Sequence, residues 1–343
     1  MNDAEIVQVT QDLKHNFSLD NRFVYHGYVA SGSYGSAHRI QYINHERGTR
    51  ADFLIKVSFG SLDARGFLRD EKEYLQQVRG GMHMVQVIDL QDHPLAPDRF
   101  RWEWTALEWL PNGTIGTFVA RAKLHGLQRL PNRLLWRFFL CMIRSCCGLA
   151  WPRNRQDNLV EIELPIEGVE PGGLAHNDLH SENVLLGDFG YGEHNISPIL
   201  KIIDFGLTSE YEPGEREAAK NTNLFELGML MIMLITLEYH FRMEMDPVWM
   251  THDNEDIETY AASILPREDD MPRPFPWLDP WLATIIGLCL ATEVNIHQIP
   301  SLEQLSTWVS IAVLERTTAF YHDFNESDAV IREICEKIVL NPP

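Results

Sequence analysis

Cysteine is scarce in this chain of 343 residues, and its five copies are scattered. No two of them have the C-x-x-C spacing that zinc-binding segments use, so their spacing predicts neither a zinc site nor a disulfide framework. An odd number of cysteines without such pairing is typical of a reducing intracellular compartment. We therefore expect a cytoplasmic protein.

Long hydrophobic runs are also missing. The first residues contain no apolar stretch of the kind found in secretory signals. The most apolar run, Leu227 to Leu237, is too short to span a bilayer and is typical of a buried helix. The sequence therefore predicts no membrane partner.

Positive charge is in short supply. The chain has 29 Lys and Arg against 49 Asp and Glu, which gives a formal net charge of −20. A surface this acidic repels nucleic acid and anionic membranes, so nucleic acid is not an expected partner. A phosphate-bearing ligand would have to be held by local cations, backbone amides or metal ions.

The chain does have the apolar content, 45%, for a sizeable core, and it is longer than one core usually organises. Before about Leu110, short alternating runs predict an antiparallel sheet interrupted by one helix at Asp63–Val78. The predicted strands are Phe23–Val29, Ala37–Ile43, Ala51–Val57, His83–Leu90 and Arg101–Trp109.

Helical patterns take over after the turn residues Pro111, Asn112 and Gly113. The predicted helices are Asn132–Leu149, Asn223–Leu237, Trp281–Leu290, Ser301–Leu314 and Ala329–Leu340. This order predicts an α+β chain of two domains. The first, at 1–110, is a small antiparallel β-sheet lobe with one key helix, and the second, at 111–343, is a larger and mainly helical lobe.

Two glycines lie in a turn between predicted strands, in the segment A-S-G-S-Y-G-S-A at 30–37. Such a turn can close over phosphates with its backbone N–H groups facing the anion. The candidate phosphate-binding residues are Gly32, Ser33, Tyr34 and Gly35. An ordinary glycine-containing hairpin gives the same pattern, so the turn is informative only together with other motifs.

Lys56 ends the apolar run F-L-I-K, where a charge is costly unless it is paired. On the helix predicted after it, Glu71 shares one face with Leu68 and Leu75. We expect this face to point inward, and a buried glutamate also needs a partner of opposite charge. Lys56 and Glu71 are therefore predicted to pair. The alternative is that Glu71 lies in solvent at the edge of the stripe.

Acidic and amide side chains gather in two segments of the second half. The segment L-A-H-N-D-L-H-S-E-N-V-L-L at 174–186 holds Asp178 and Asn183, and the apolar run at 199–203 ends at Asp204. Asn183 and Asp204 offer the hard oxygen ligands that Mg²⁺ prefers. Asp178 would remain free to accept a proton from a hydroxyl. The alternative is a set of solvated loop carboxylates.

A D-F-G triplet occurs at Asp188, Phe189 and Gly190, and a second one begins at Asp204. The first follows Asn183 too closely to allow a returning strand. It lies in a stretch rich in Gly, Asn and Pro, which we interpret as an extended turn between two short strands and assign no chemistry.

Taken in order, these motifs resemble those of the eukaryotic protein kinase superfamily over about residues 23–314. The turn at 30–37 resembles the family's glycine-rich loop, and Lys56 and Glu71 match its strand lysine and helix glutamate. The segment L-E-W-L-P-N-G, beginning at Leu107, resembles the hinge. H-N-D-L-H-S-E-N at 176–183 matches the catalytic loop H-R-D-L-x-x-x-N, and the triplet at Asp204 matches the metal-binding D-F-G.

The resemblance implies a bilobal protein-kinase-like fold with ATP and Mg²⁺ as cofactors. Lys56, oriented by Glu71, would hold the α- and β-phosphates. Asn183 and Asp204 would bind Mg²⁺, and Asp178 would orient and deprotonate the acceptor. The adenine ring would meet the backbone of Glu108 and Leu110 and lie between Ala37, Leu54 and Leu185.

Some departures from the family are mild: the first glycine of its loop is Ala30 here, and its adenine-contacting Val and Ala appear as Ala37 and Leu54. The other departures fall on the acceptor side. Asn177 replaces the Arg that often reads a phosphate on the activation loop, so that form of control is not expected. His180 replaces a Lys, and the resulting H-x-D-L-H-x-x-N also resembles aminoglycoside and choline kinases. The A-P-E motif is absent and its Arg partner falls at Ile299, so one buried ion pair is missing as a unit, which can be energetically neutral.

We therefore expect an ATP-dependent phosphotransferase that acts on a hydroxyl, with a small-molecule acceptor slightly favoured over a protein Ser or Thr. The alternatives are an atypical protein kinase, a pseudokinase scaffold, and an ATP-using enzyme that transfers AMP or activates its substrate. His180 is a further catalytic candidate, as a second acid or base, as an orienting group or as a phosphate ligand. Met243, Met245 and nearby Trp249 are candidates for an acceptor pocket, although packing is the simpler interpretation.

Overall fold

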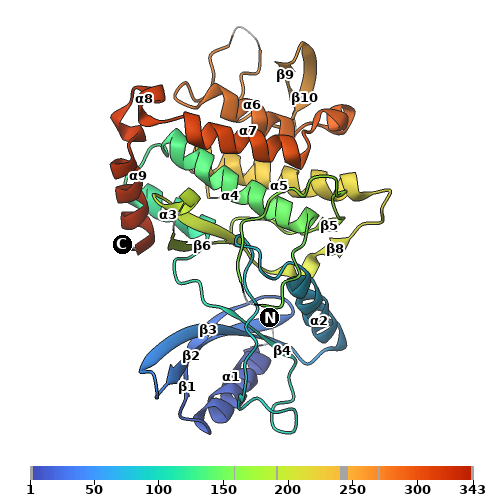
Figure 1. Ribbon diagram of the computed structural model, residues 1–343, viewed down its shortest axis with the longest axis vertical. Coiled ribbons are helices and arrows are strands. Elements are labelled where there is room, and N and C mark those ends of the chain that lie inside the picture. The colour runs from blue at the N-terminus through green and yellow to red at the C-terminus, as the bar shows by residue number, and fades with distance from the viewer. Residues whose placement is uncertain (1–2, 158, 191, 240–245, 269–270, 341–343) are drawn as a thin grey trace.

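The structure is a computed structural model that describes residues 3–157, 159–190, 192–239, 246–268 and 271–340. It has the expected α+β composition. A four-stranded antiparallel sheet lies at one end of the molecule and most of the helices lie at the other (Figure 1). The candidate acceptor-pocket residues Met243 and Met245 lie outside the described residues.

The sheet has the strand order β1-β2-β3-β4, in which neighbouring strands are antiparallel. Its strands are β1 (Phe23–Ser31), β2 (Gly35–Asn44), β3 (Thr49–Ser58) and β4 (Trp104–Glu108). Phe53, Ile55 and Val57 alternate along β3 into one buried cluster, so Leu54 and Lys56 point to the opposite face. The alternation of β3 thus decides which side chains can line a site.

A helix that the sequence analysis did not predict covers the apolar face of this sheet. It is α1 (Asp3–Ser18), and its side chains Val9, Leu13 and Phe17 are fully buried in the same cluster as β3. Those three residues are spaced four apart, which places them on one side of a helix.

The predicted strand at His83–Leu90 is wrong. This segment makes only isolated bridge pairs, Met84 with Ile202 and Val87 with Leu107. Each end therefore touches a different neighbour, and no continuous ladder forms. The predicted strand at Arg101–Trp109 is confirmed only in its second half, as β4.

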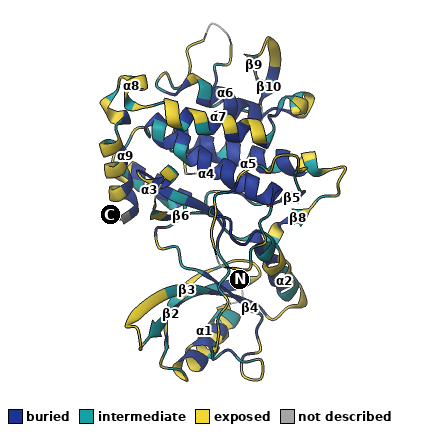
Figure 2. Ribbon diagram, viewed as in Figure 1, coloured by how far each residue is buried: buried dark blue, intermediate teal, exposed yellow. Residues whose placement is uncertain are grey.

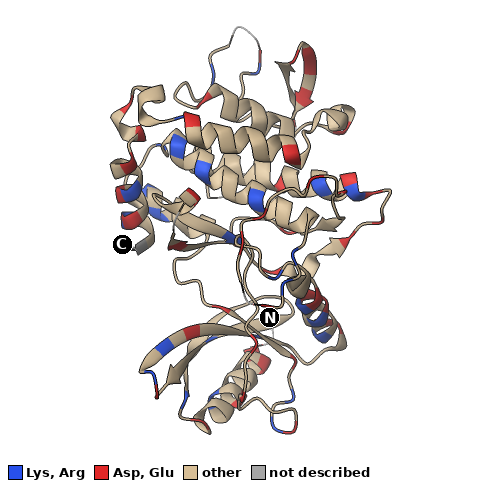
Figure 3. Cartoon of the chain, in the orientation of Figure 1, with Lys and Arg blue, Asp and Glu red and all other residues tan. Residues whose placement is uncertain are grey.

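Helix α2 (Leu62–Gln77) is confirmed with its expected orientation. It begins at the N-cap Ser61, whose side chain accepts a hydrogen bond from Ala64 N–H, and it buries Leu68, Glu71 and Leu75. Acidic and basic residues alternate along its outer side (Figure 3). The buried stripe therefore carries Glu71 into the interior, as the sequence pattern predicts.

The helices of the larger part surround α4, which is buried along nearly its whole length and packs against α5 and α7 (Figure 2). These helices are α3 (Ile115–Leu124), α4 (Asn132–Ala150), α5 (Arg216–Thr236), α6 (Pro280–Cys289), α7 (Leu302–Glu315), α8 (Thr318–Tyr321) and α9 (Asp328–Cys335). Helix α3 was not predicted, and α5 begins two turns earlier than predicted. The S-x-x-Q spacing before α7 does form a capping box between Ser301 and Gln304.

Among the described residues, three short antiparallel strand pairs complete the larger part. Their strands are β5 (Leu174–Ala175) with β8 (Ser209–Glu210), β6 (Val184–Phe189) with β7 (Pro198–Ile202), and β9 (Val248–His252) with β10 (Glu255–Thr259). The first D-F-G triplet is partly extended, because Asp188 and Phe189 end β6 and only Gly190 lies in the turn to β7. Within the described part of the chain, no helix is long and apolar enough to cross a membrane.

Candidate functional site

A cavity of about 620 Å³ lies where the sheet meets the larger, mainly helical part. Its walls come from the glycine turn, β3, α2, the 107–114 segment, the 178–185 loop and the end of β7. The predicted site residues that line it are Gly32, Gly35, Ala37, Leu54, Lys56, Glu71, Glu108, Leu110, Asp178, His180, Asn183, Leu185 and Asp204. Residues spread over most of the chain thus converge on one cavity.

Two predicted site residues do not line this cavity. The ring of Tyr34 stacks on Phe67 of α2 with ring centroids 4.0 Å apart, and Ser33 is exposed at the tip of the turn. The apolar face of the tyrosine finds a partner on α2, which turns the tip away from the pocket. The side chains of Ser33 and Tyr34 are therefore removed from the candidate site.

Gly35 sits where β2 approaches β3 most closely. A Cβ atom at this position would lie 2.4 Å from the carbonyl oxygen of Val57, a distance that real Cβ atoms do not reach. The turn is closed by a hydrogen bond of 3.0 Å from Gly32 N–H to Gly35 O. A Cβ on Gly32, in contrast, would meet nothing within 4 Å. Gly35 is thus required by packing, and Gly32 is not.

Lys56 is held by two carboxylates from distant parts of the chain. Its Nζ lies 2.7 Å from Glu71 Oε2 and 2.8 Å from Asp204 Oδ1. The Glu71 side chain is only 2% exposed, which excludes the alternative that it is solvated. The predicted pair is therefore confirmed in its geometry, and the third partner, Asp204, was not predicted as a contact of Lys56.

Lys56 and Asp204 stabilise each other's charged forms, whereas burial raises the pKa of Glu71. Burial opposes the charge of Lys56, but Glu71 and Asp204 raise its pKa above the usual value. Burial likewise opposes ionisation of Asp204, but Lys56 holds the pKa of that carboxyl below its usual value. Asp204 is consequently ionised at neutral pH, as a metal ligand must be.

Asp204 has an unusual backbone conformation. Its φ of +64° and ψ of +72° place it in the left-handed region, which non-glycine residues seldom adopt. Asp204 lies two residues after the end of β7. The residue between them, Ile203, donates its N–H to Asn183 O at 2.9 Å. The strained residue is therefore anchored to the loop that supplies the other polar groups of the cavity.

Asp178, His180 and Asn183 form one hydrogen-bonded group. Asn183 Nδ2 donates to Asp178 Oδ2 at 2.9 Å and lies 3.2 Å from His180 Nε2. His180 Nε2 is also 3.6 Å from Asp178 Oδ1. Because the amide nitrogen of Asn183 is directed at Asp178, its amide oxygen is the atom available to a cation.

A buried histidine supports this group from behind. His176 is fully buried, its backbone N–H donates to Asn223 Oδ1 at 2.9 Å, and its Nε2 lies 3.0 Å from Ile203 O. Burial lowers the pKa of His176 to about 4, so the ring is neutral at physiological pH. Asn223 also donates to Leu174 O at 2.9 Å, so it holds the segment before Asp178 to α5 at two points.

Asn177 takes a structural role. Its φ of +61° is left-handed, and its Nδ2 donates to Leu207 O at 3.0 Å and to Ser209 Oγ at 2.8 Å. The neutral amide of Asn177 therefore joins the loop to the segment after Asp204. The link does not depend on a phosphorylated residue. Ile299, where the family's Arg would fall, is 8% exposed within the large apolar cluster. Apolar packing thus occupies the place expected for an ion pair.

Glu108 lines the cavity, and its side chain is engaged in other contacts. Lys201 Nζ lies 2.5 Å from Glu108 Oε1, and Gln86 N–H donates to the same oxygen at 2.8 Å. Lys201 is only 8% exposed and was missed by the sequence analysis. Its position inside the apolar run before Asp204 was a readable signal, since a buried lysine needs a carboxylate.

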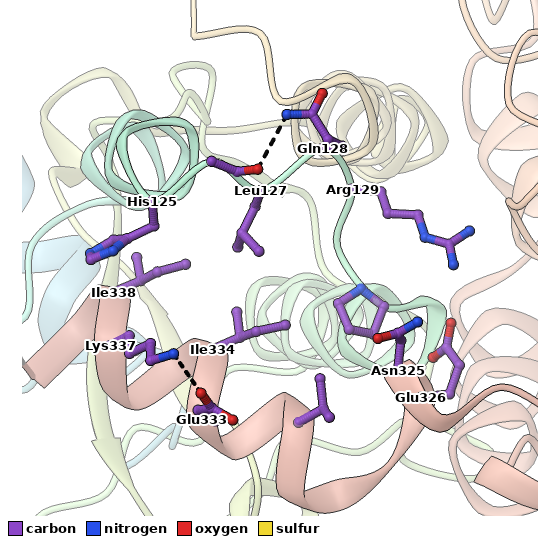
Figure 4. Close-up of a pocket in the computed structure, with 13 residues that line it drawn as sticks. His125, Leu127, Gln128, Arg129, Asn325, Glu326, Glu333, Ile334, Lys337 and Ile338 are labelled. Atoms are coloured by element: carbon purple, nitrogen blue, oxygen red, sulfur yellow. Dashed lines mark hydrogen bonds and ion pairs between the residues drawn. The ribbon is translucent and has the colours of Figure 1, made fainter.

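A second cavity, of about 650 Å³, lies between the 125–131 segment and α9 with the turn that follows it (Figure 4). Its walls combine apolar side chains such as Leu127, Ile334 and Ile338 with a surface ion pair between Glu333 and Lys337. No predicted site residue lines it. The first cavity is therefore the candidate functional site.

Comparison of the sequence with family models and with curated proteins returned no match.

Proposed function

We propose that this chain is an ATP- and Mg²⁺-dependent phosphotransferase with a bilobal protein-kinase-like fold. The observation that carries the proposal is the bridge from Lys56 to both Glu71 and Asp204, at a cavity that Asp178 and Asn183 also line. Buried charges are costly, and a lysine placed between two carboxylates is well suited to hold a polyphosphate. Solvated loop carboxylates do not account for this arrangement.

The described residues fit the groups that the proposal requires. The walls at Ala37, Leu54 and Leu185 are apolar and suit a flat base, and the backbone of Glu108 and Leu110 lies at the cavity edge. Asn183 and Asp204 supply hard oxygen atoms for Mg²⁺. A Mg²⁺ ion held there would neutralise charge on the β- and γ-phosphates.

Asp178 is assigned the role of base. It would accept the proton of the acceptor hydroxyl while the acceptor oxygen bonds to the γ-phosphorus and the bond to the departing ADP oxygen breaks. Asn183 holds the Asp178 carboxylate through the bond at 2.9 Å. His180, at 3.6 Å from Asp178, is best placed to orient that carboxylate or to meet the acceptor. Catalysis would come mostly from positioning and electrostatics.

The acceptor is proposed to be a small molecule that carries a hydroxyl group. Three features of the acceptor side support this choice over a peptide. Asn177 links the loop to the segment after Asp204 through hydrogen bonds of its neutral amide. His180 stands in place of a lysine, and Ile299 stands in place of an arginine. A protein Ser or Thr is the second candidate acceptor, because the sequence of the helical part resembles that of protein kinases. Transfer of AMP is a third, and its products differ from ADP.

The test is an incubation of the purified chain with Mg-ATP and a panel of hydroxyl compounds and proteins, followed by analysis for ADP, AMP and pyrophosphate. Asp178→Asn is expected to bind Mg-ATP as wild type does but to lose transfer by at least ~100-fold. Asp188→Asn is the matched control, because it changes the exposed aspartate of the other D-F-G triplet, outside the cavity.

The outcomes separate the candidates. ADP formation with a labelled small molecule supports the proposal, and protein labelling without small-molecule turnover overturns the choice of acceptor. Wild-type turnover by Asp178→Asn overturns the role of Asp178. A chain that Mg-ATP does not stabilise against heat supports the pseudokinase scaffold instead.

A further inference from the structure

Three buried side chains outside the candidate site bring imidazole and thiol groups together. His83 follows α2, Cys141 lies in the middle of α4, and His194 ends the short 3₁₀ turn Gly192–His194 between β6 and β7. One donor atom from each lies within 4.8 Å of the other two. Their exposed fractions are 0%, 1% and 4%. None of the three lines the cavity described above.

The hydrogen bonds of His83 leave one nitrogen directed at the cluster without a partner. Its Nδ1 lies 2.6 Å from Glu163 Oε2, and its backbone N–H donates to Glu163 Oε1 at 2.7 Å. Its Nε2 is buried and has no hydrogen-bond partner among the described residues. Because Nδ1–H donates to the Glu163 carboxylate, Nε2 is the nitrogen that a metal can use, once any proton on it has been released to solvent. A histidine held by a carboxylate in this way is the usual outer support of a zinc ligand.

The spacing of Cys141 and His194 also matches a metal site. Cys141 Sγ lies 3.7 Å from His194 Nδ1, a distance that also suits a weak hydrogen bond to sulfur. With Zn–S near 2.3 Å and Zn–N near 2.0 Å, the sulfur and nitrogen of a tetrahedral site are ~3.5 Å apart. All three donor atoms lie within 4.8 Å of one another, close enough for the third to reach the same ion by a small side-chain adjustment.

We propose that His83, Cys141 and His194 bind one Zn²⁺ ion and that this ion joins the β6–β7 turn and the segment after α2 to α4. Two imidazole nitrogens and one thiolate are a donor set that zinc accepts. A water molecule would complete the tetrahedral coordination. Binding releases the thiol proton of Cys141 to solvent.

The site is independent of the proposed phosphotransfer and has a structural consequence. Glu163 belongs to the segment between α4 and β5, which bonds to His83 through Glu163 and to the preceding residue through Met82 N–H and Glu161 O at 3.0 Å. Val85, two residues from His83, lines the large cavity. A bound ion would therefore brace one wall of that cavity. The spacing of the cysteines could not indicate this site, because its ligands come from three distant segments.

Metal analysis of the full chain, produced with zinc and dialysed against zinc-free buffer, tests the proposal. Wild type is expected to keep about one zinc per chain, while Cys141→Ser and His194→Gln are expected to keep less than about a tenth as much. Cys146→Ser is the matched control, because Cys146 lies on the same helix, is equally buried and is outside the cluster. Glu163→Gln is expected to lower zinc affinity by about 10- to 100-fold without abolishing binding.

A second measurement keeps the test decisive if a variant fails to fold. Wild type loaded with Co²⁺ is expected to show the near-ultraviolet absorption of a cobalt–thiolate bond, and removal of the metal with a chelator is expected to lower its melting temperature. The proposal is overturned if wild type holds no zinc and neither Zn²⁺ nor chelator moves its melting temperature. Full zinc retention in Cys141→Ser would also overturn it. Either result would leave the cluster as a network of thiol and imidazole contacts.

Discussion

At the scale of single residues, the contacts of Lys56 decide how its loss would act. Its ammonium neutralises Glu71, which is 2% exposed, so Lys56→Met would leave a buried carboxylate without a cation. Removing one partner of a buried pair costs about 3–5 kcal/mol. We expect the free energy of unfolding in urea to fall by about that amount, and stabilisation by Mg-ATP to be lost.

The double variant Lys56→Met with Glu71→Leu separates stability from function. It removes the pair as a unit, which is often neutral when apolar side chains replace it. Asp204 keeps access to solvent, since its side chain is 44% exposed. The double variant should therefore recover most of the stability that Lys56→Met loses, but no phosphotransfer. A double variant as unstable as the single one contradicts this account.

His38 predicts a pH dependence of stability. The ring is fully buried in β2, its nitrogens lie 3.0 Å from the Tyr25 hydroxyl and 2.9 Å from the Ser36 hydroxyl, and burial lowers its pKa from 6.5 to about 4. Between pH 4 and 6.5, His38 therefore binds a proton in the unfolded chain but not in the folded chain. Stability is unaffected above pH 6.5 and falls as the pH drops towards 4, by on the order of 3 kcal/mol.

The measurement is the urea midpoint as a function of pH for wild type and for His38→Gln. Other groups also titrate in acid, but they do so equally in both proteins. The difference in stability between the two proteins should thus change between pH 6.5 and 4 and be constant above. A difference that does not vary with pH would show that His38 titrates alike in the folded and unfolded chains.

At the scale of elements, the turn between β1 and β2 contrasts two glycines that look alike in sequence. Gly35→Ala forces a Cβ atom against the carbonyl of Val57, so β2 and β3 must separate or shift. Overpacking of this kind costs roughly 1–3 kcal/mol. Gly32→Ala meets nothing within 4 Å and should leave stability within about 0.5 kcal/mol of wild type. Thermal unfolding of both variants is the measurement, and equal losses would contradict the contrast.

How far the elements could be predicted depends on whether their signals are local. The α2 stripe and the Ser301–Gln304 capping box are local, so both were predicted correctly. The pairing of Lys56 with Glu71 was also predictable, because each buried charge requires the other. Helix α1 was missed although its buried residues show helical spacing.

The remaining errors concern contacts between distant segments. His83–Leu90 was predicted as a strand from its alternating apolar residues, but Met84 and Val87 pair separately with Ile202 and Leu107, and His83 to Val85 are all buried. The contact between Lys56 and Asp204 joins residues 148 positions apart, so no local pattern encodes it. The same holds for the cluster of His83, Cys141 and His194, whose members are individually unremarkable in the sequence.

At the scale of the whole molecule, the buried apolar side chains form two separate clusters. The smaller joins α1 to the sheet, and the larger fills the mainly helical part. A small core buries less surface and is correspondingly less stable. The Lys56–Asp204 contact crosses between the two, because Lys56 is on β3 and Asp204 follows β7.

This arrangement predicts how amide hydrogen exchange should vary along the chain. Amides of β1 to β3 are expected to exchange faster than those of α4 and α5, since they depend on the smaller cluster. Saturating Mg-ATP, at about 100 times its dissociation constant, would add about 2.7 kcal/mol of stability. If it binds between the clusters, it should slow exchange both in the 31–36 turn and around Asp204. Exchange measured by mass spectrometry with and without Mg-ATP tests this.

The Asp204→Asn variant supplies the control for that experiment. It removes the negative charge that faces Lys56 and the proposed metal, so Mg²⁺ should no longer increase the protection that ATP gives. Protection confined to the helical side in wild type would mean that nucleotide does not bridge the clusters. The other outcome is protection on both sides in wild type and its loss in the variant. It would show that bound nucleotide replaces the link between Lys56 and Asp204, because both residues would then contact the ligand instead of each other.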